Sequence, residues 1–354
     1  MSLNLPFSRV TVMGSGLIGT SIGLALAQRG VKVRMQDLNQ KSEALAQDLV
    51  GPCDEADPEL IIVAVPILEF AGVVAALESS TVKLGFIDVG SVKVKPKVDI
   101  QSSSIEDSRF LPTHPMAGRE VGGAESARAD LFEGRPWIID SSGVEPNLLA
   151  AGKALISALG SHLVDMPAAE HDNAVAVVSH LPQLVASLLA KQLPSANPQW
   201  LELAGGGLRD TTRIAASDAG LWSEIVSVNS EAIKPLLESL HADLESLIAD
   251  VANSKKVHEF IESGRVGRAA IPGKHGGKAR TYTFLPIVIE DKPGQLAAIF
   301  NECAQVKVNI EDLSIEHSPG QQTGLITLAL SSDDAAVLSE HLSSKGWSVH
   351  TARS

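Results

Sequence analysis

The sequence predicts an α/β domain with a doubly wound parallel sheet, an all-helical domain and a small C-terminal domain of βαββαβ order. Three observations indicate this. Short apolar strands alternate with helical stretches over residues 1–167, residues 168–263 keep only a helical period, and residues 282–354 return to strands. Strand–helix alternation is typical of a parallel sheet covered by helices.

The elements of the first domain follow from short apolar runs. A helix of small and apolar residues, 18–29, ends at Gly30 and joins the first two strands. Because the chain returns to the same direction after such a crossover, the strands should be parallel. The predicted strands are residues 10–13, 32–36, 60–65, 85–88, 109–112 and 137–140.

The middle of the chain has a helical period. From residue 233 onward, apolar side chains recur at helical spacing, at Leu236, Leu237, Leu240, Leu244, Leu247, Ile248 and Val251. Such a stripe packs in a core or in a dimer interface, and we expect a homodimer formed through this domain.

Residues 264–281 are rich in glycine and basic residues and contain no acid, which predicts a linker. Beyond it, strands are predicted at residues 283–290, 308–316, 323–330 and 347–351, with helices at 294–306 and 333–345. That order is the ferredoxin-like one.

Composition excludes several classes of protein. The 354 residues are 44% hydrophobic with a formal net charge of −13, which argues against a nucleic-acid or anionic-membrane binder. Two distant cysteines, Cys53 and Cys303, indicate neither a disulfide framework nor a zinc site, and we expect no metal. No signal peptide or long apolar span is expected, so the predicted location is the cytoplasm.

A glycine-rich turn carries the first functional signal. Gly14, Gly16 and Gly19 form GxGxxG between the first strand and the first helix. In this Rossmann-type fingerprint the glycines allow a tight turn, close approach of a pyrophosphate and close helix packing. A turn that binds nothing is the alternative.

Asp37 follows the second strand, 23 residues after Gly14. A carboxylate there accepts hydrogen bonds from ribose hydroxyls and repels a 2′-phosphate, which favours NAD over NADP. Further cofactor contacts are expected from Leu17, Ile18, Val65, Pro66 and Asp88.

Two polar segments follow later strands at the same sheet edge. Ser91 comes after the strand 85–88, and His114 after the strand 109–112, in a loop stiffened by Pro112 and Pro115. An imidazole beside a nicotinamide is a suitable base for a hydroxyl proton. The alternatives are a turn serine and a structural histidine.

The helical domain offers two more candidates. His180 precedes Pro182, which should kink the helix and turn the ring toward a cleft; a core histidine is the alternative. Arg209 and Arg213, four residues apart around Asp210, can grip a carboxylate or form a surface ion-pair cluster.

Together these motifs resemble the prephenate/arogenate dehydrogenase family of tyrosine biosynthesis. The matching segments are the glycine turn, Gly90 to Lys93, His114 to Gly118, Ser179 to Pro182 and Arg209 to Ala215. The resemblance covers about residues 8–260.

The resemblance implies an NAD-dependent oxidative decarboxylation of prephenate or arogenate. His114 would accept the hydroxyl proton, and Ser91 would orient His114 and the hydroxyl. Arg213 would bind a substrate carboxylate, His180 would contact the substrate, and Glu120, Asp210 and Arg209 would lie at the cleft. One departure is Gln183, which stands where many relatives have histidine, so the choice between the two substrates stays open.

The C-terminal part resembles an ACT domain, a module that binds small regulatory ligands. This implies an amino-acid effector, tyrosine or phenylalanine, while a structural or dimerising tail is the alternative. The residues expected at the effector site are Asp291, Pro293, Gly294, Gln295, Leu296 and Asn309.

Two other functions are weighed against this one. A 3-hydroxyacid or imine-reducing dehydrogenase usually relies on a lysine in the helical region, and Lys191 lacks a comparable setting. A non-catalytic sensor of NAD and an amino acid would have no turnover to lose when His114 is replaced.

Overall fold

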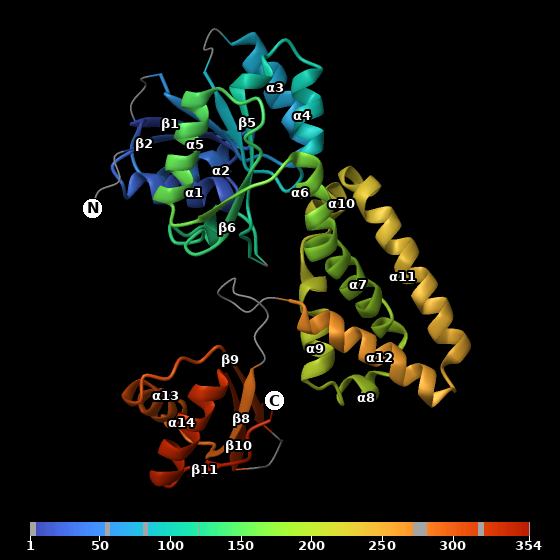
Figure 1. Ribbon diagram of the computed structural model, residues 1–354. Helices are drawn as coiled ribbons and strands as arrows, with labels where there is room; N and C mark the ends of the chain where they lie inside the picture. Colours follow the sequence, from blue (N-terminus) through green and yellow to red (C-terminus); the bar gives the residue numbers. More distant parts are fainter. Residues whose placement is uncertain are drawn as a thin grey trace. The chain divides into compact units, whose positions relative to one another are not determined.

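The computed structural model describes residues 5–53, 57–80, 84–119, 121–271, 282–317 and 322–353. The chain divides into two compact units, residues 1–243 and 244–354. The boundary falls inside helix α11 (Ser230–Asp250), and Figure 1 shows the order of the elements.

Unit 1 begins with a seven-stranded sheet in the order β2-β1-β3-β4-β5-β6-β7. All neighbouring strands are parallel except β5 and β6. The doubly wound sheet is therefore confirmed, with one antiparallel pair and one strand, β7, that the sequence analysis did not predict. The strands are β1 (Arg9–Met13), β2 (Lys32–Gln36), β3 (Leu60–Val63), β4 (Phe86–Asp88), β5 (Phe110–Pro115), β6 (Pro136–Ile139) and β7 (His162–Asp165).

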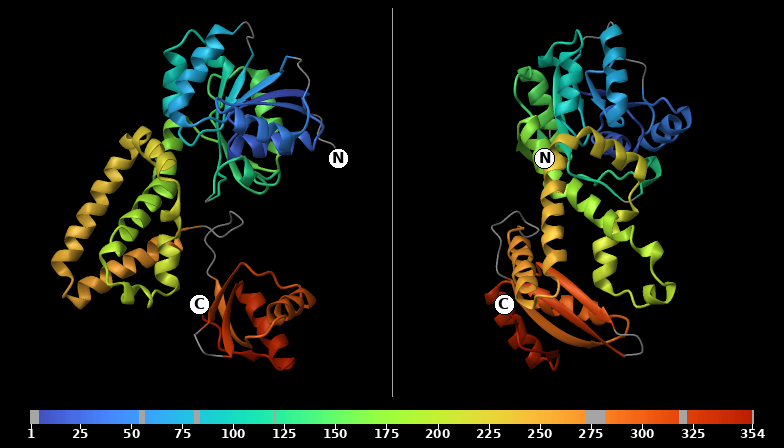
Figure 2. Two further views of the ribbon diagram at one scale, coloured as in Figure 1. Left: turned by 180° about the vertical axis from the view of Figure 1, so that it is seen from behind. Right: turned by 90° about the vertical axis from the view of Figure 1, so that its right-hand side faces the viewer.

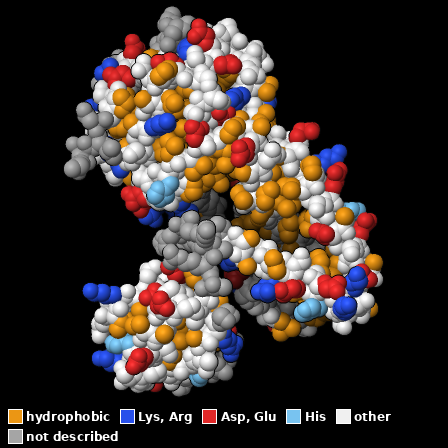
Figure 3. Space-filling view, in the orientation of Figure 1, with side chains coloured by type: hydrophobic (Ala, Val, Ile, Leu, Met, Phe, Trp, Pro, Cys, Tyr) orange, Lys and Arg blue, Asp and Glu red, His pale blue; other side chains and the backbone are white. Residues whose placement is uncertain are grey.

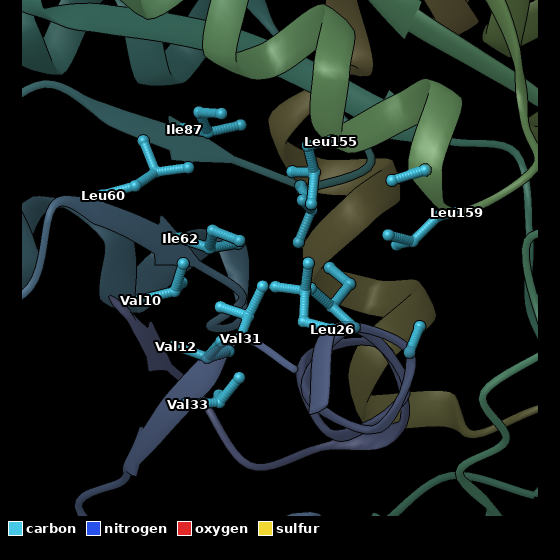
Figure 4. Close-up of a cluster of buried hydrophobic side chains, with 14 of the residues drawn as sticks. Val10, Val12, Leu26, Val31, Val33, Leu60, Ile62, Ile87, Leu155 and Leu159 are labelled. Atoms are coloured by element: carbon cyan, nitrogen blue, oxygen red, sulfur yellow. The ribbon is translucent and has the colours of Figure 1, made fainter. Parts of the chain in front are cut away.

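Helices lie on both faces of this sheet, as the views in Figures 1 and 2 agree. Alternate side chains of a strand point to opposite faces. On one face Val12, Ile62 and Ile87 pack with α1 (Leu17–Ala27) and α5 (Pro146–Ala158), the cluster drawn in Figure 4. On the other, strand residues such as Ile61 and Phe86 pack with α3 (Phe70–Ser79) and α4 (Val94–Gln101). Helix α2 (Gln40–Val50) follows β2.

His114 does not lie in a loop, as the sequence suggested, but within β5. The first half of β5 pairs with β4, and from Thr113 onward the strand pairs antiparallel with β6, which places His114 opposite Ile138. The prolines at 112 and 115 do not end the strand: β5 pairs with β4 as far as Pro112 and with β6 from Thr113 to Pro115.

The predicted helix break at Pro182 takes the form of a wide turn. Helix α6 (Ala168–Val175) passes into the π turn η4 (Ala176–His180) and then into α7 (Leu181–Ala190). Proline has no N–H for the Val178 carbonyl, and an inserted π turn accommodates that loss without ending the helix. The remaining helices of this part are α8 (Pro198–Leu201), α9 (Gly206–Thr212), η6 (Arg213–Ala216) and α10 (Ala219–Val228).

Within the described residues, one helical stretch, Ala168–Ser195, is long and apolar enough to span a membrane by length and composition alone. No such stretch was expected from the sequence. This stretch carries His171, Asp172 and His180, which are all buried.

Unit 2 holds α12 (Ser254–Ala269) and a four-stranded antiparallel sheet in the order β11-β8-β10-β9. Residues 264–269, expected in the linker, belong to α12, where Arg265 pairs with Glu262 one turn earlier. Residues 272–281 lie outside the described residues. The βαββαβ order is confirmed by β8 (Thr283–Glu290), α13 (Gln295–Gln305), β9 (Asp312–His317), β10 (Thr323–Leu330), α14 (Ser332–Ser344) and β11 (Ser348–Val349).

Candidate active site

The glycine turn after β1 is shaped for a bound molecule. Gly14 has a φ of +106° and donates its N–H to the Gln36 carbonyl at 2.7 Å. A Cβ on Gly14 would lie 2.2 Å from the Ala64 oxygen, and one on Gly19 would lie 2.0 Å from the Gly14 oxygen. A Cβ on Gly16 would meet nothing within 4 Å. Gly14 and Gly19 thus serve the fold, and Gly16 leaves open space in front of α1.

The start of α1 has unused donors and a buried polar atom beside this space. Gly16 is the N-cap and supplies no side-chain hydrogen bond, and Ser15 Oγ is buried with no partner among the described residues. Unpaired N–H groups and the helix dipole favour an anion here. Leu17, Ile18 and Val65 are partly buried, and Pro66 is exposed. These features fit the pyrophosphate of a dinucleotide.

Asp37 is fixed at the end of β2. Its Oδ2 accepts the Ser15 N–H at 2.7 Å, and its Oδ1 accepts the Asn39 N–H at 2.8 Å. Glu43 accepts the N–H of Asp37 itself at 2.8 Å. Each carboxylate oxygen of Asp37 keeps a lone pair for a ribose hydroxyl. The acid expected to favour NAD is thus held rigidly beside the glycine turn.

Asp88 lies inside the protein at the end of β4, only 1% exposed. It forms an ion pair with Lys93, which also donates to the Thr113 carbonyl, and it accepts the N–H groups of Gly90 and Thr113 at 3.0 Å each. Burial raises the pKa of Asp88, and the charge on Lys93 opposes that rise. The carboxylate expected near the cofactor therefore holds β4, β5 and the loop of Ser91 together.

Two side chains, those of His171 and Asp172, lie in line behind His114. His114 Nδ1 lies 2.8 Å from His171 Nε2, and His171 Nδ1 lies 2.7 Å from Asp172 Oδ1. Asp172 also accepts the N–H groups of Lys93 and Val94, at 2.8 and 2.9 Å. His171 and Asp172 were not predicted from the sequence; an acid next to a histidine, shortly before the segment of His180, was the available signal.

The environment keeps the imidazole of His114 neutral. Burial lowers its pKa well below 6.5, and the nearby His171, Lys93 and His180 lower it further. A neutral ring at neutral pH has one bare nitrogen, which is what a general base requires.

His180 lies buried at the end of the π turn, 2% exposed. The amide nitrogen of Asn229 lies 3.1 Å from its Nδ1 and donates to the Asp172 carbonyl at 2.8 Å. Trp222 meets the ring edge-on with centroids 6.0 Å apart. Burial lowers the pKa of His180 to about 4, so this ring is also neutral. Asn229 was not found from the sequence.

The other expected site residues have these positions. Ser91 is partly buried just after β4, and Gln183 is buried one turn after His180, with Ser217 Oγ 3.4 Å from its Oε1. Arg209 and Asp210 are exposed on α9, and Arg213 begins η6, which packs against α7. Glu120 lies outside the described residues.

The expected effector turn lies between β8 and α13. Gly294 has a φ of +94° and is the N-cap of α13, without a side-chain hydrogen bond to the helix. Pro293 is exposed, and Leu296 is 38% exposed. Asn309 donates to Glu311 at 3.1 Å, and the Asp291 N–H donates to the Gln322 carbonyl at 2.8 Å.

Two known protein domains match this chain. Residues 22–164 match the nucleotide-binding domain of prephenate dehydrogenase, and residues 167–263 match the prephenate dehydrogenase dimerisation domain. The chain belongs to the prephenate dehydrogenase family. The expected fold class and enzyme class are thereby confirmed: the chain is an NAD-dependent oxidoreductase of tyrosine biosynthesis.

Individual relatives of the family agree. A probable prephenate dehydrogenase of Streptomyces niveus is 29% identical over 357 residues, covering 96% of this chain and 99% of the relative. The prephenate dehydrogenase of Bacillus subtilis is 26% identical, with 92% of each covered. The crystal structure of the Aquifex aeolicus prephenate dehydrogenase in complex with hydroxyphenyl propionate and NAD+ is 27% identical, covers 75% of this chain and 98% of its own, and has a TM-score of 0.65.

Membership of this soluble enzyme family explains the apolar stretch Ala168–Ser195. It is a helix of the dimerisation domain, and its buried polar residues belong to the site described above. Its exposed apolar side chains are Val177, Val178, Val185, Leu188 and Leu189.

Proposed function

We propose that this chain oxidises and decarboxylates prephenate to 4-hydroxyphenylpyruvate with NAD+, using His114 as the general base. The contact that supports this best is the 2.8 Å approach of His114 Nδ1 to His171 Nε2. Because Nδ1 is engaged there, the other nitrogen of His114 is left to accept a proton. His114 and Asp88 lie near the carboxyl ends of β5 and β4, at the edge of the sheet where the glycine turn follows β1. Ligands of such sheets bind at this edge.

The protein's share of the reaction is a proton transfer and the control of charge. NAD+, when bound, takes the hydride from the ring carbon that carries the hydroxyl. His114 Nε2 accepts the hydroxyl proton, the bond from the ring to its carboxylate breaks, and its electron pair completes the aromatic ring as carbon dioxide leaves. His114 then returns the proton to the phenolate oxygen. In this proposal Ser91 orients the hydroxyl, Arg213 binds the side-chain carboxylate, and Arg209, Asp210 and Glu120 lie at the entrance.

The residues of the glycine turn would hold the cofactor. Gly16 leaves room for the pyrophosphate, and Asp37 accepts the ribose hydroxyls and disfavours a 2′-phosphate, so we infer NAD+ rather than NADP+. Bordering the same space are Leu17, Ile18, Val65 and Pro66. Asp88 is buried nearby, paired with Lys93.

Arogenate is the second candidate substrate, because relatives named cyclohexadienyl and arogenate dehydrogenase match as well. Gln183, which stands where many relatives have histidine, is buried one turn from His180 and is uncharged, so the choice between the two substrates stays open. Formation of NADH, measured in parallel with prephenate and arogenate, decides between them. Turnover that requires prephenate supports the proposal, and turnover with arogenate alone replaces it. His114→Asn should bind NAD+ as before and lose turnover by about 10²–10⁴-fold.

We also infer that the chain works as a homodimer in the cytoplasm. Figure 3 shows hydrophobic side chains gathered over the helical region of α7. A contiguous apolar surface of this kind on a dimerisation domain suits a second copy of the chain. Sedimentation of the purified protein should give twice the chain mass. The free Cys53 and Cys303 suit a reducing compartment.

For the C-terminal sheet we propose an amino-acid effector at the turn between β8 and α13. The left-handed Gly294 and the uncapped start of α13 leave backbone N–H groups for a carboxylate. Asp291, Pro293, Gln295 and Leu296 adjoin that turn in sequence. Asn309, just before β9, lies toward the other end of β8, where Asp312 pairs with Ala329 and Ala329 with Phe284. Titration of the full chain with tyrosine and with phenylalanine tests this. Binding of neither, with an unchanged rate, would leave the sheet a structural or dimerising module.

A further inference from the structure

We propose that Asp172 is a positioning residue that fixes opposite proton positions on the two histidines of the site. Its carboxylate acts on His114 through His171, and its backbone carbonyl acts on His180 through Asn229. The inference rests on the proposed function, in which His114 is the base and His180 contacts the substrate.

The carboxylate arm can be followed proton by proton. Asp172 accepts three N–H groups, from Lys93, Val94 and His171, so it is the acceptor in each contact. His171 therefore carries its proton on Nδ1 and presents a bare Nε2 to His114. The contact at 2.8 Å then requires the proton of His114 on Nδ1. The Nε2 of His114 is left as a lone pair.

The carbonyl arm gives the reverse result on His180. A carbonyl oxygen only accepts, so the Asn229 atom that lies 2.8 Å from the Asp172 oxygen is the amide nitrogen. The same nitrogen lies 3.1 Å from His180 Nδ1 and donates its second hydrogen there. The Nδ1 of His180 is therefore bare, and its proton is on Nε2.

The two rings are thus neutral and complementary: one offers a base and the other a hydrogen-bond donor. The two rings influence each other electrostatically, so a positive charge on His180 would make His114 a weaker base. A neutral donor binds a substrate oxygen without adding that charge. Asp172 is 4% exposed and Asn229 is 5% exposed, so water does not compete with either arm.

Nitrogen-15 NMR of the histidine rings tests this in the full chain at neutral pH without substrate. Bare and hydrogen-bearing ring nitrogens have well separated shifts, and His114→Asn and His180→Asn assign the two rings. We expect hydrogen on Nδ1 of His114 and on Nε2 of His180. The opposite tautomer on either ring, or a charged ring, overturns the proposal. The result does not depend on turnover, so it stands apart from a failure of the proposed function.

Variants test the arms separately. Asn229→Asp replaces the donor with an acceptor, which should move hydrogen onto His180 Nδ1, leave His114 unchanged and raise KM for prephenate about tenfold with little change in kcat. Asn253→Asp, at the exposed N-cap of α12, is the control with the same change of charge. A purely structural Asn229 would instead leave the His180 tautomer unchanged.

For the carboxylate arm, His171→Leu removes the acceptor that faces His114, and His171→Gln retains one. Loss of kcat in the first variant and recovery in the second are expected, each with the matching tautomer signal from His114. Equal loss of kcat in both, with the His114 tautomer unchanged, would contradict the proposed path.

Discussion

Lys93 and Asp88 form an ion pair that is almost completely removed from water, at the point where β4 ends and the loop of Ser91 begins. Both side chains are 1–2% exposed. The Lys93 ammonium also bonds the Thr113 carbonyl, one residue before His114. The pair therefore joins β4 to β5, the strand that carries His114.

Removal of one partner should destabilise the fold strongly. Lys93→Met leaves the Asp88 carboxylate buried without its countercharge, which typically costs about 3–5 kcal/mol. Urea unfolding measures the loss. The control is Arg128→Ala, which breaks the exposed pair with Asp130 and should leave the unfolding midpoint unchanged. Equal, small effects of both variants would contradict the buried pair's role.

The glycines of the turn should separate folding from cofactor binding. Gly16→Ala adds a methyl group where nothing lies within 4 Å, so the protein should fold normally and lose NAD+ affinity. Gly19→Ala places a Cβ 2.0 Å from the Gly14 oxygen and should destabilise the fold itself. Thermal unfolding and NAD+ titration of the two variants distinguish these effects. Normal NAD+ binding by Gly16→Ala would show that the pyrophosphate does not bind in this space.

The rate should remain high at acidic pH. His114 has a pKa well below 6.5, chiefly because it is buried, so it stays a base as the pH falls through 6.5. We expect kcat/KM to be level there and to decline only nearer the lowered pKa. The profile is measured over the range in which circular dichroism shows a folded protein. A half-maximal rate at or above pH 6.5 would be inconsistent with this environment.

Stability should fall over the same acidic range, because His180 resists protonation in the fold. Its pKa is about 4 in the folded protein, against 6.5 as the ordinary value. Between these values the unfolded chain binds more protons, so the contribution is complete above pH 6.5 and is lost as the pH falls toward 4. The loss is on the order of 3 kcal/mol. His180→Asn should flatten the dependence of the urea midpoint on pH, and an unchanged slope would exclude His180 as its source.

Much of the fold could be predicted because its strands are continuous apolar runs. Strand β2 and strands β8 and β10 have the predicted bounds. Strand β7 was missed because it is short and mostly exposed, with only Leu163 and Val164 as its apolar residues. The extent of β5 was missed because its second half is stabilised by β6, a partner that local sequence does not reveal.

The same limit applies to the site. Motifs identified His114 and His180 as candidates, and their chemistry could be stated from residue type. His171, Asp172 and Asn229 act through contacts with residues 49–79 positions away, such as that from Lys93 to Asp172. Such contacts have no period or spacing in the sequence.

Helix α4 is capped by a residue from a later part of the chain. Its own N-cap, Lys93, provides no side-chain hydrogen bond, and Asp172 accepts the N–H groups of Lys93 and Val94 instead. During synthesis the nucleotide-binding part emerges first. We expect its glycine turn to form without the helical domain, whereas α4 gains its cap and His114 its partner only when α6 docks. We therefore expect the enzyme to mature in two stages, with the glycine turn formed first and His114 oriented when the helical domain docks.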